Sequence, residues 1–277
     1  DNDTAGSAEA ILERETEKIW ETMKDLGVDM SVFDVLSYPN LFHNLKAAIK
    51  DACSGKDNQN LNIYYEDTKI SPKEMLEIIK NKEFSRFPEN MAGAAREAYE
   101  TLLHTGDGQL CDVIIDRAAL DAIYAAGEAA KDSIIKEYAE SVVAIADIKI
   151  AVRSQKTAKT IEFMKRAMAP CKSINVEQLS KAAAAGMEAV VEYLSGTAYA
   201  EGGQAIAESS SAFERWCDNR MMQAMQPQKY ESFSVGPLVA YVLARENEIK
   251  TVRIILSGKQ NGFSEESIRE RVREMYV

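Results

Sequence analysis

The residues of this sequence that could do chemistry are few and scattered. Glu100 and His104 lie four residues apart, so both could project from one face of a helix toward a metal ion. Metal sites built from helical carboxylates instead use a glutamate and a histidine three residues apart, in two copies. The chain has only one other histidine, His43, which lies beside an apolar run and is interpreted as a hydrogen-bonded structural residue. We therefore expect no metal site.

Nucleophiles and nucleotide-binding loops are not indicated either. Ser209, Ser210 and Ser211 are consecutive, but they lack the G-x-S-x-G turn of a serine nucleophile and are interpreted as a loop before a helix starting near Phe213. Neither G-x-x-x-x-G-K-[ST] nor G-x-G-x-x-G occurs. Acidic pairs four residues apart, such as Asp112 with Asp116, are interpreted as exposed. We expect no catalytic residue and no cofactor.

Charge and cysteine spacing restrict the environment and the partners. A net charge of −11 disfavours nucleic acid and anionic lipid headgroups, so the expected partners are proteins. No apolar run approaches the roughly 18 residues that cross a bilayer, and the first residues do not resemble a signal peptide. Direct bilayer insertion is not expected. The four cysteines show no C-x-x-C spacing and are interpreted as reduced thiols in the cytoplasm: Cys53, Cys111, Cys171 and Cys217.

The elements that must position these residues are predicted to be helices. Residues 131–169 contain neither glycine nor proline, which indicates one long helix or two nearly continuous helices. The only candidate strand is the short run LNIYY at 61–65, within a polar loop. The fold class is therefore all-α.

One amphipathic helix is predicted after Pro237, which suits a first helical turn. Gly258 is predicted to end it, and Glu246 and Lys250 are spaced for an exposed ion pair. The predicted packing face consists of Leu238, Val242, Arg245, Ile249, Val252 and Leu256.

The chain contains an internal repeat with a period near 102 residues. HNLKAAIK (43–50), ADIKIAVR (146–153) and NEIKTVRI (247–254) place Lys46, Lys149 and Lys250 in register. A second marker follows each lysine: ISPKEM, INVEQL and FSEESI have the pattern of a capped helix start, with Ser71, Asn175 and Ser264 as the caps. We therefore predict three related helical units, at 1–112, 113–205 and 206–277. With only three units, closure about a pseudo-threefold axis is preferred to a solenoid.

A local excess of positive charge interrupts this acidic chain. Residues 149–172 include only one acidic residue, Glu162, and seven basic residues: Lys149, Arg153, Lys156, Lys159, Lys165, Arg166 and Lys172. This basic stretch could steer an acidic partner, or it could neutralise the protein's own acidic surfaces. Both interpretations stay open. The candidates for partner contact are Lys46, Lys149, Arg153, Lys156, Lys159, Lys165, Arg166 and Lys250.

The C-terminal sequence PLVAYVLARENEIKTVRIILSGKQNGFSEESIRERVREMYV (237–277) resembles the C subunit of V-type (A-type) ATPases, the counterpart of the d subunit of the eukaryotic vacuolar enzyme. YPNLFHNLKAAIK (38–50) is similar to the first-unit element of that family. Members usually begin with a few dozen further helical residues, so the resemblance implies that an N-terminal part of the first unit is missing here.

The resemblance implies a funnel-shaped, non-catalytic adaptor on the cytoplasmic face of the membrane. There it would join the central shaft, made of the D and F subunits, to the proteolipid ring, so that ATP synthesis or hydrolysis is linked to H⁺ or Na⁺ transport. The alternatives are an all-helical binding scaffold unrelated to the ATPase and a helical enzyme. More and shorter repeats would be typical of the scaffold, and a convergent polar cluster of the enzyme.

Overall fold

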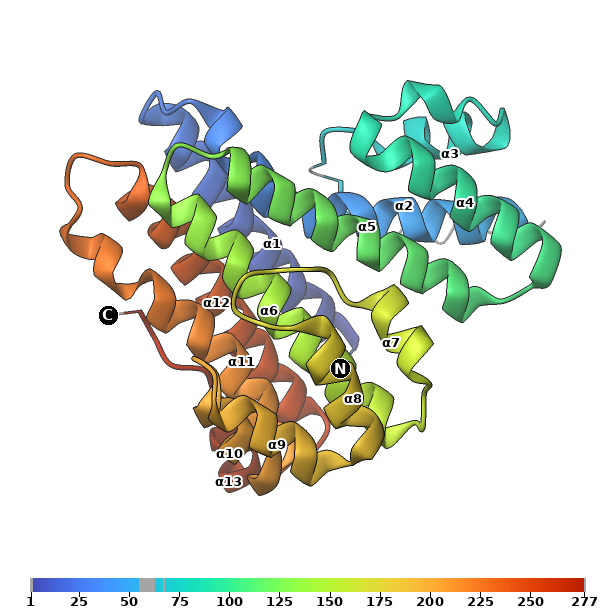
Figure 1. Ribbon diagram of the computed structural model, residues 1–277. Coiled ribbons are helices and arrows are strands. Elements are labelled where there is room, and N and C mark those ends of the chain that lie inside the picture. Colours follow the sequence, from blue (N-terminus) through green and yellow to red (C-terminus); the bar gives the residue numbers. More distant parts are fainter. Residues whose placement is uncertain (1, 55–62, 67, 277) are drawn as a thin grey trace. The chain divides into compact units, whose positions relative to one another are not determined.

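The computed structural model describes residues 2–54, 63–66 and 68–276, and over these residues all regular structure is helical (Figure 1). The predicted all-α class is confirmed. Of the candidate strand at 61–65, residues 61 and 62 lie outside the described residues, and 63–65 form no strand.

The chain divides into two compact parts, which we call lobes. Lobe 1 contains Asp1–Phe33, Ala130–Ser141 and Met187–Val277, and lobe 2 contains Asp34–Ala129 and Val142–Gly186. The three predicted helical units are a division by sequence similarity and stay a prediction.

Lobe 2 is built around two long helices, α2 (Asp34–Ser54) and α5 (Gly108–Ala129), which pack on each other. Its core joins residues of α2, α3, α4 and α5 and includes the fully buried Leu45, Ile79 and Ile115. The elements of this lobe are α2 (Asp34–Ser54), α3 (Pro72–Lys80), η3 (Phe84–Arg86), α4 (Glu89–Thr105), α5 (Gly108–Ala129), the C-terminal half of α6 (Ser133–Lys156), α7 (Ile161–Ala167) and α8 (Val176–Ala185).

In lobe 1 the first helix, α1, packs on α12, the helix that was predicted after Pro237. Ion pairs join Glu15 to Arg245 (3.1 Å) and Glu9 to Arg253 (2.5 Å), and Leu12 of the first helix is buried. The elements of this lobe are α1 (Asn2–Asp25), η1 (Met30–Phe33), the start of α6, α9 (Met187–Ser195), α10 (Ala200–Glu208), α11 (Ser210–Met225), η4 (Gln226–Tyr230), α12 (Gly236–Gln260) and α13 (Glu265–Arg269).

All three predicted helix caps are confirmed. The side chains of Ser71, Asn175 and Ser264 accept hydrogen bonds from the backbone N–H groups three residues later, at 3.2, 3.0 and 3.2 Å. These bonds satisfy donors that the first turn of a helix leaves without an intrahelical partner. The repeated marker in the sequence therefore corresponds to a repeated local structure.

Two predicted helix ends were wrong. Gly258 lies inside α12. A Cβ at this position would lie 2.7 Å from Cγ1 of Ile268, so the glycine permits close packing of Ile268 on α12. Gly262, at φ +70°, is the residue that turns the chain after α12. Ser209 caps α11 through the backbone N–H of Ala212 (2.9 Å), so that helix begins three residues before Phe213.

The glycine-free stretch 131–169 forms two helices, α6 and α7, as one of the two predicted alternatives had it. The break falls at Ala158, whose φ of 51° is a left-handed conformation that favours glycine. Lys159 N–H then donates to Ser154 O (2.9 Å) and closes the end of α6.

The predicted packing face of α12 was right only in part. Val242 and Ile249 are buried, whereas Val252 is 42% exposed. Burial of Leu243, Ala244 and Thr251 on other faces shows that this helix is enclosed on most sides.

Buried polar side chains near the register lysines fix irregular backbone. Asn44, which is fully buried, donates to Tyr65 O (2.7 Å) and accepts from Tyr65 N–H (2.9 Å). Asp147, also fully buried, accepts from Ala169 N–H (3.0 Å). Asn247 donates to Glu274 O (2.9 Å). Each bond satisfies a backbone group that no helix satisfies.

Candidate interaction surfaces

The predicted basic stretch follows the end of α6, the turn after it and α7, all in lobe 2. Arg153 and Lys156 are exposed in the last turn of α6, where positive charge is favourable beside the negative end of the helix dipole. Lys149 is half-buried one turn earlier.

Three members of the stretch bind acidic residues of the same lobe. Lys165 pairs with Glu177 at 2.5 Å, Arg166 with Glu97 at 2.9 Å and Lys172 with Glu128 at 2.8 Å. The hydrogen bond from Lys165, followed by one from Lys181, lowers the pKa of the Glu177 carboxyl. These pairs support the interpretation that the stretch neutralises the protein's own acidic surface.

Other members keep more of their charge available. Lys159 donates to Gln109 Oε1 (2.7 Å) and lies 5.1 Å from the centre of the Phe163 ring, so its charge is not paired there with a carboxylate. The Arg153 guanidinium forms no hydrogen bond or ion pair within the described residues. Arg153 is therefore the best candidate in the stretch for contact with an acidic partner.

Two of the three register lysines join helices within their own lobes. Lys46 on α2 binds Asp116 on α5 at 2.8 Å, and Lys250 on α12 binds Asp218 on α11 at 2.7 Å. Lys250 belongs to lobe 1, and the other seven residues predicted to contact partners belong to lobe 2.

Two expectations about charges need correction. Asp116 is exposed as expected and Asp112 is half-buried, but both also form ion pairs: Asp112 pairs with Lys50 at 2.6 Å, and Asp116 pairs with Lys46. Lys250 pairs with Asp218 in place of the nearby Glu246, because α11 brings a less exposed carboxylate within reach.

Among the acidic residues of the described ion pairs of lobe 1, Asp218 has the least exposed side chain. It accepts from Lys250 and also from Arg273 Nε at 2.6 Å, and the side chains of Asp218 and Arg273 are only 17% and 8% exposed. Burial raises the pKa of the Asp218 carboxyl, but the Lys250 ammonium and the Arg273 guanidinium lower it by more, so the pKa is below its usual range. This triad ties α11, α12 and the C-terminal segment together.

The candidate chemical groups do not converge. Within residues 2–54, 63–66 and 68–276 no group of three or more His, Cys, Asp or Glu side chains could hold a metal ion. Glu100 and His104 are both exposed on α4, and His43 Nε2 lies 3.0 Å from Ile63 O, as expected for a structural histidine. A shallow hollow of about 610 Å³ is lined by charges of both signs: Arg215, Glu265, Glu266, Arg269 and Glu270.

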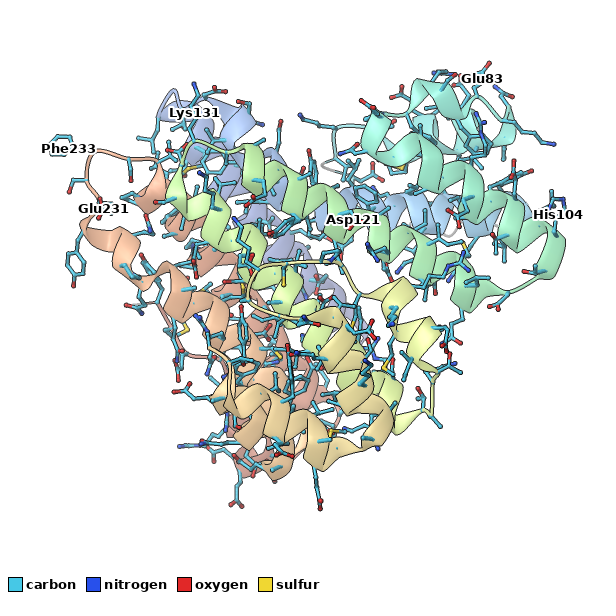
Figure 2. All side chains as sticks on the ribbon, in the orientation of Figure 1. Glu83, His104, Asp121, Lys131, Glu231 and Phe233 are labelled. Atoms are coloured by element: carbon cyan, nitrogen blue, oxygen red, sulfur yellow. The ribbon has the colours of Figure 1, made fainter. Side chains whose placement is uncertain are left out.

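Sequence reasoning missed one conspicuous surface feature. Phe233, in the connection between η4 and α12, is fully exposed, and Tyr230, the last residue of η4, is 83% exposed. Figure 2 shows Phe233 pointing away from the ribbon at the edge of lobe 1. A short aromatic segment between Pro227 and Pro237 carries no periodic signal, so the sequence alone did not distinguish it from an ordinary loop.

Comparison with known proteins gives the family. The family described as "ATP synthase (C/AC39) subunit" matches residues 1–271. The chain is 25% identical over 272 residues to the C subunit of the V-type sodium ATPase of Enterococcus hirae, a match covering 97% of this chain and 82% of the relative. It is 23% identical over 151 residues to the C subunit of the A-type ATP synthase of Methanocaldococcus jannaschii, covering 51% of this chain and 38% of the relative. No solved structure matches the chain.

The helices were also compared with what a bilayer requires. None of those in the part of the chain that the structure describes is both long enough and apolar enough to cross a membrane.

Proposed function

The chain belongs to the ATP synthase (C/AC39) subunit family, which includes the C subunits of V-type and A-type ATPases, and we propose that it is the non-catalytic rotor adaptor of such an enzyme. In this proposal it joins the central shaft, made of the D and F subunits, to the proteolipid ring on the cytoplasmic face of the membrane. Rotation then links ATP synthesis or hydrolysis to H⁺ or Na⁺ transport. Its three helical units would surround a pseudo-threefold axis as a funnel.

The observation that carries the proposal is the family match, which extends over residues 1–271 and so includes both lobes. The same match makes a scaffold unrelated to the ATPase untenable. A torque-transmitting part needs stiffness, because a compliant joint would wind instead of turning. Capped helices, close-packed cores and side-chain bonds between helices are features that supply stiffness.

The test is isolation of the tagged full chain from native membranes. We expect the proteolipid ring and the D and F subunits to be recovered with it, and membranes that lack the chain to hydrolyse ATP without ion transport. Recovery of neither ring nor shaft, or ion pumping that is unaffected by loss of the chain, would contradict the proposal.

The basic stretch is proposed to contact one of these partners through Arg153. Replacement by Glu should weaken assembly about tenfold at low salt and less at higher salt, since exposed charges are screened beyond about 10 Å at 0.1 M salt. The matched control is Lys73→Glu, the same reversal at an exposed lysine on α3. Binding of ring and of D–F complex should be measured separately across a salt series. Equal effects of the two reversals would show that only the net charge matters.

A further inference from the structure

Two of the four cysteines lie on helices that pack against each other in the core of lobe 2. Cys53 is on α2 and Cys111 is on α5, and both are free thiols. Cys111 is fully buried in the core cluster of the lobe, whereas Cys53 is half-buried and packs against the same cluster. The two side chains therefore reach one core from its two long helices.

Two ion pairs fix how α2 and α5 are aligned. Lys46 binds Asp116 at 2.8 Å, and Lys50, one turn later on α2, binds Asp112 at 2.6 Å, one turn earlier on α5. The two helices are therefore antiparallel. Continued to the next turn, this alignment brings the two cysteines within two residues of facing each other, which is about 3 Å along the helix axis.

Helices that pack this closely can be joined by a disulfide. In lobe 2, α2 and α5 lie side by side (Figure 1), and their Cα atoms come within 8 Å of one another along the contact. A disulfide needs two facing cysteines whose Cα atoms are about 4 to 7 Å apart. A small shift of one helix along the other is therefore the only adjustment that the pair requires.

Burial keeps both thiols protonated at neutral pH. It raises the pKa of the Cys53 thiol, and it raises the pKa of Cys111 to about 11, with smaller contributions from the negative charges of Asp112 and of an ionised Cys53. The influence of Cys53 on Cys111 agrees with two sulfur atoms that lie near each other. Because thiolates rather than thiols react with oxidants, the pair stays reduced until an oxidant persists, and the more accessible Cys53 then reacts first.

We infer that Cys53 and Cys111 form a reversible disulfide when the chain meets hydrogen peroxide, and that this bond fastens α2 to α5. The Cys53 thiolate attacks one peroxide oxygen and the O–O bond breaks, which gives a sulfenic acid at Cys53 and a hydroxide that takes up the thiol proton as water. The Cys111 thiolate then attacks the Cys53 sulfur, the S–O bond breaks, and the leaving hydroxide takes up the Cys111 proton as a second water. The peroxide gains two electrons, and each sulfur loses one.

The experiment oxidises the reduced full chain with hydrogen peroxide at about pH 8.5, where more of each thiol is ionised than at neutral pH. Free thiols are then blocked with N-ethylmaleimide, and peptides are mapped by mass spectrometry without reduction. We expect one linked pair of peptides, which joins Cys53 to Cys111. The melting temperature should rise by about 5 °C, because the bond closes a long loop of the unfolded chain. Dithiothreitol should reverse both changes.

Cys53→Ser should lose the linked peptides and the rise in melting temperature. The matched control is Cys171→Ser, at a cysteine of the same lobe that is also half-buried, and it should keep both.

Four outcomes would overturn the inference. The first is that Cys53 and Cys111 stay free thiols or that Cys53 is oxidised to a sulfinic acid instead. The second is that linked peptides contain Cys171 or Cys217 equally often. The third is that oxidised Cys53→Ser gains the same stability as the wild type, and the fourth is that the linked chain melts no higher than the reduced one. Formation of this disulfide does not depend on the proposed rotor function, so each of these outcomes would leave that function standing.

Discussion

Lys46 and Lys250 have similar neighbours, but the aspartate that binds Lys46 is exposed and the aspartate that binds Lys250 is mostly buried. In both places a register lysine binds an aspartate on another helix, and a buried asparagine close by on the same helix binds irregular backbone. Around Lys46 the ion pair is a single one, and Asp116 is 59% exposed. Around Lys250 the aspartate is 17% exposed and is shared with the buried Arg273.

This difference means that residues at corresponding positions of the repeat can contribute differently to stability. An exposed pair is screened by water and contributes little, whereas breaking a buried network leaves a charge without compensation. Up to residue 276, where the described part of the chain ends, the C-terminal segment forms no helix after α13, and side-chain bonds hold it instead. Arg273 binds Asp218, and both backbone groups of Glu274 bind asparagines, Asn219 and Asn247.

The largest effect is expected for Asp218→Ala. It removes the carboxylate from Lys250 and leaves the buried Arg273 guanidinium unpaired, which should lower the free energy of unfolding by about 3 kcal/mol. Urea unfolding at pH 7 measures the change. Arg273→Met in the Asp218→Ala background should restore part of the loss, and a loss below about 1 kcal/mol in Asp218→Ala would remove the distinction between the two places.

The pH dependence of the same variant sharpens the distinction. Because the pKa of Asp218 is lower in the folded chain, its contribution is fully present above the unfolded pKa, about 3.9, and disappears as the pH falls through the folded value. The difference in stability between wild type and Asp218→Ala should therefore be constant from pH 7 down to about pH 5 and should shrink below about pH 4. A difference that grows with acidity would have the wrong sign.

Asn44→Ala is expected to reduce stability by an amount between the effects of Asp218→Ala and Asp116→Ala. Although the ion pair of the nearby Lys46 is exposed, Asn44 itself is fully buried. It deprives Tyr65 N–H and Tyr65 O of their partner and opens a cavity at a fully buried position, at a cost of about 2 kcal/mol. The control is Asn40→Ala on the same helix, at a partly exposed position. Equal losses in the two variants would mean that the bonds to Tyr65 add nothing.

What could be predicted from the sequence was what local chemistry decides. Ser71, Asn175 and Ser264 bond to groups three residues away, so their roles are visible in a short window. Gly258 was misread because its reason, Ile268, approaches from another element. Lys165 and Arg166 were interpreted without their carboxylate partners, which lie on α8 and α4. Exposure of Phe233 likewise depends on what the fold leaves uncovered.

The smallest effect is expected for Asp116→Ala. It breaks only the pair with Lys46, one of whose members is largely exposed, so the free energy of unfolding should change by less than about 0.5 kcal/mol. Urea unfolding in low and in 1 M salt would measure it, with the smaller change in high salt. A loss approaching that of Asp218→Ala would mean that the ion pair of Lys46 contributes as much to stability as that of Lys250, despite its greater exposure. A negligible loss would mean that the first-unit lysine is available to a partner at little cost in stability.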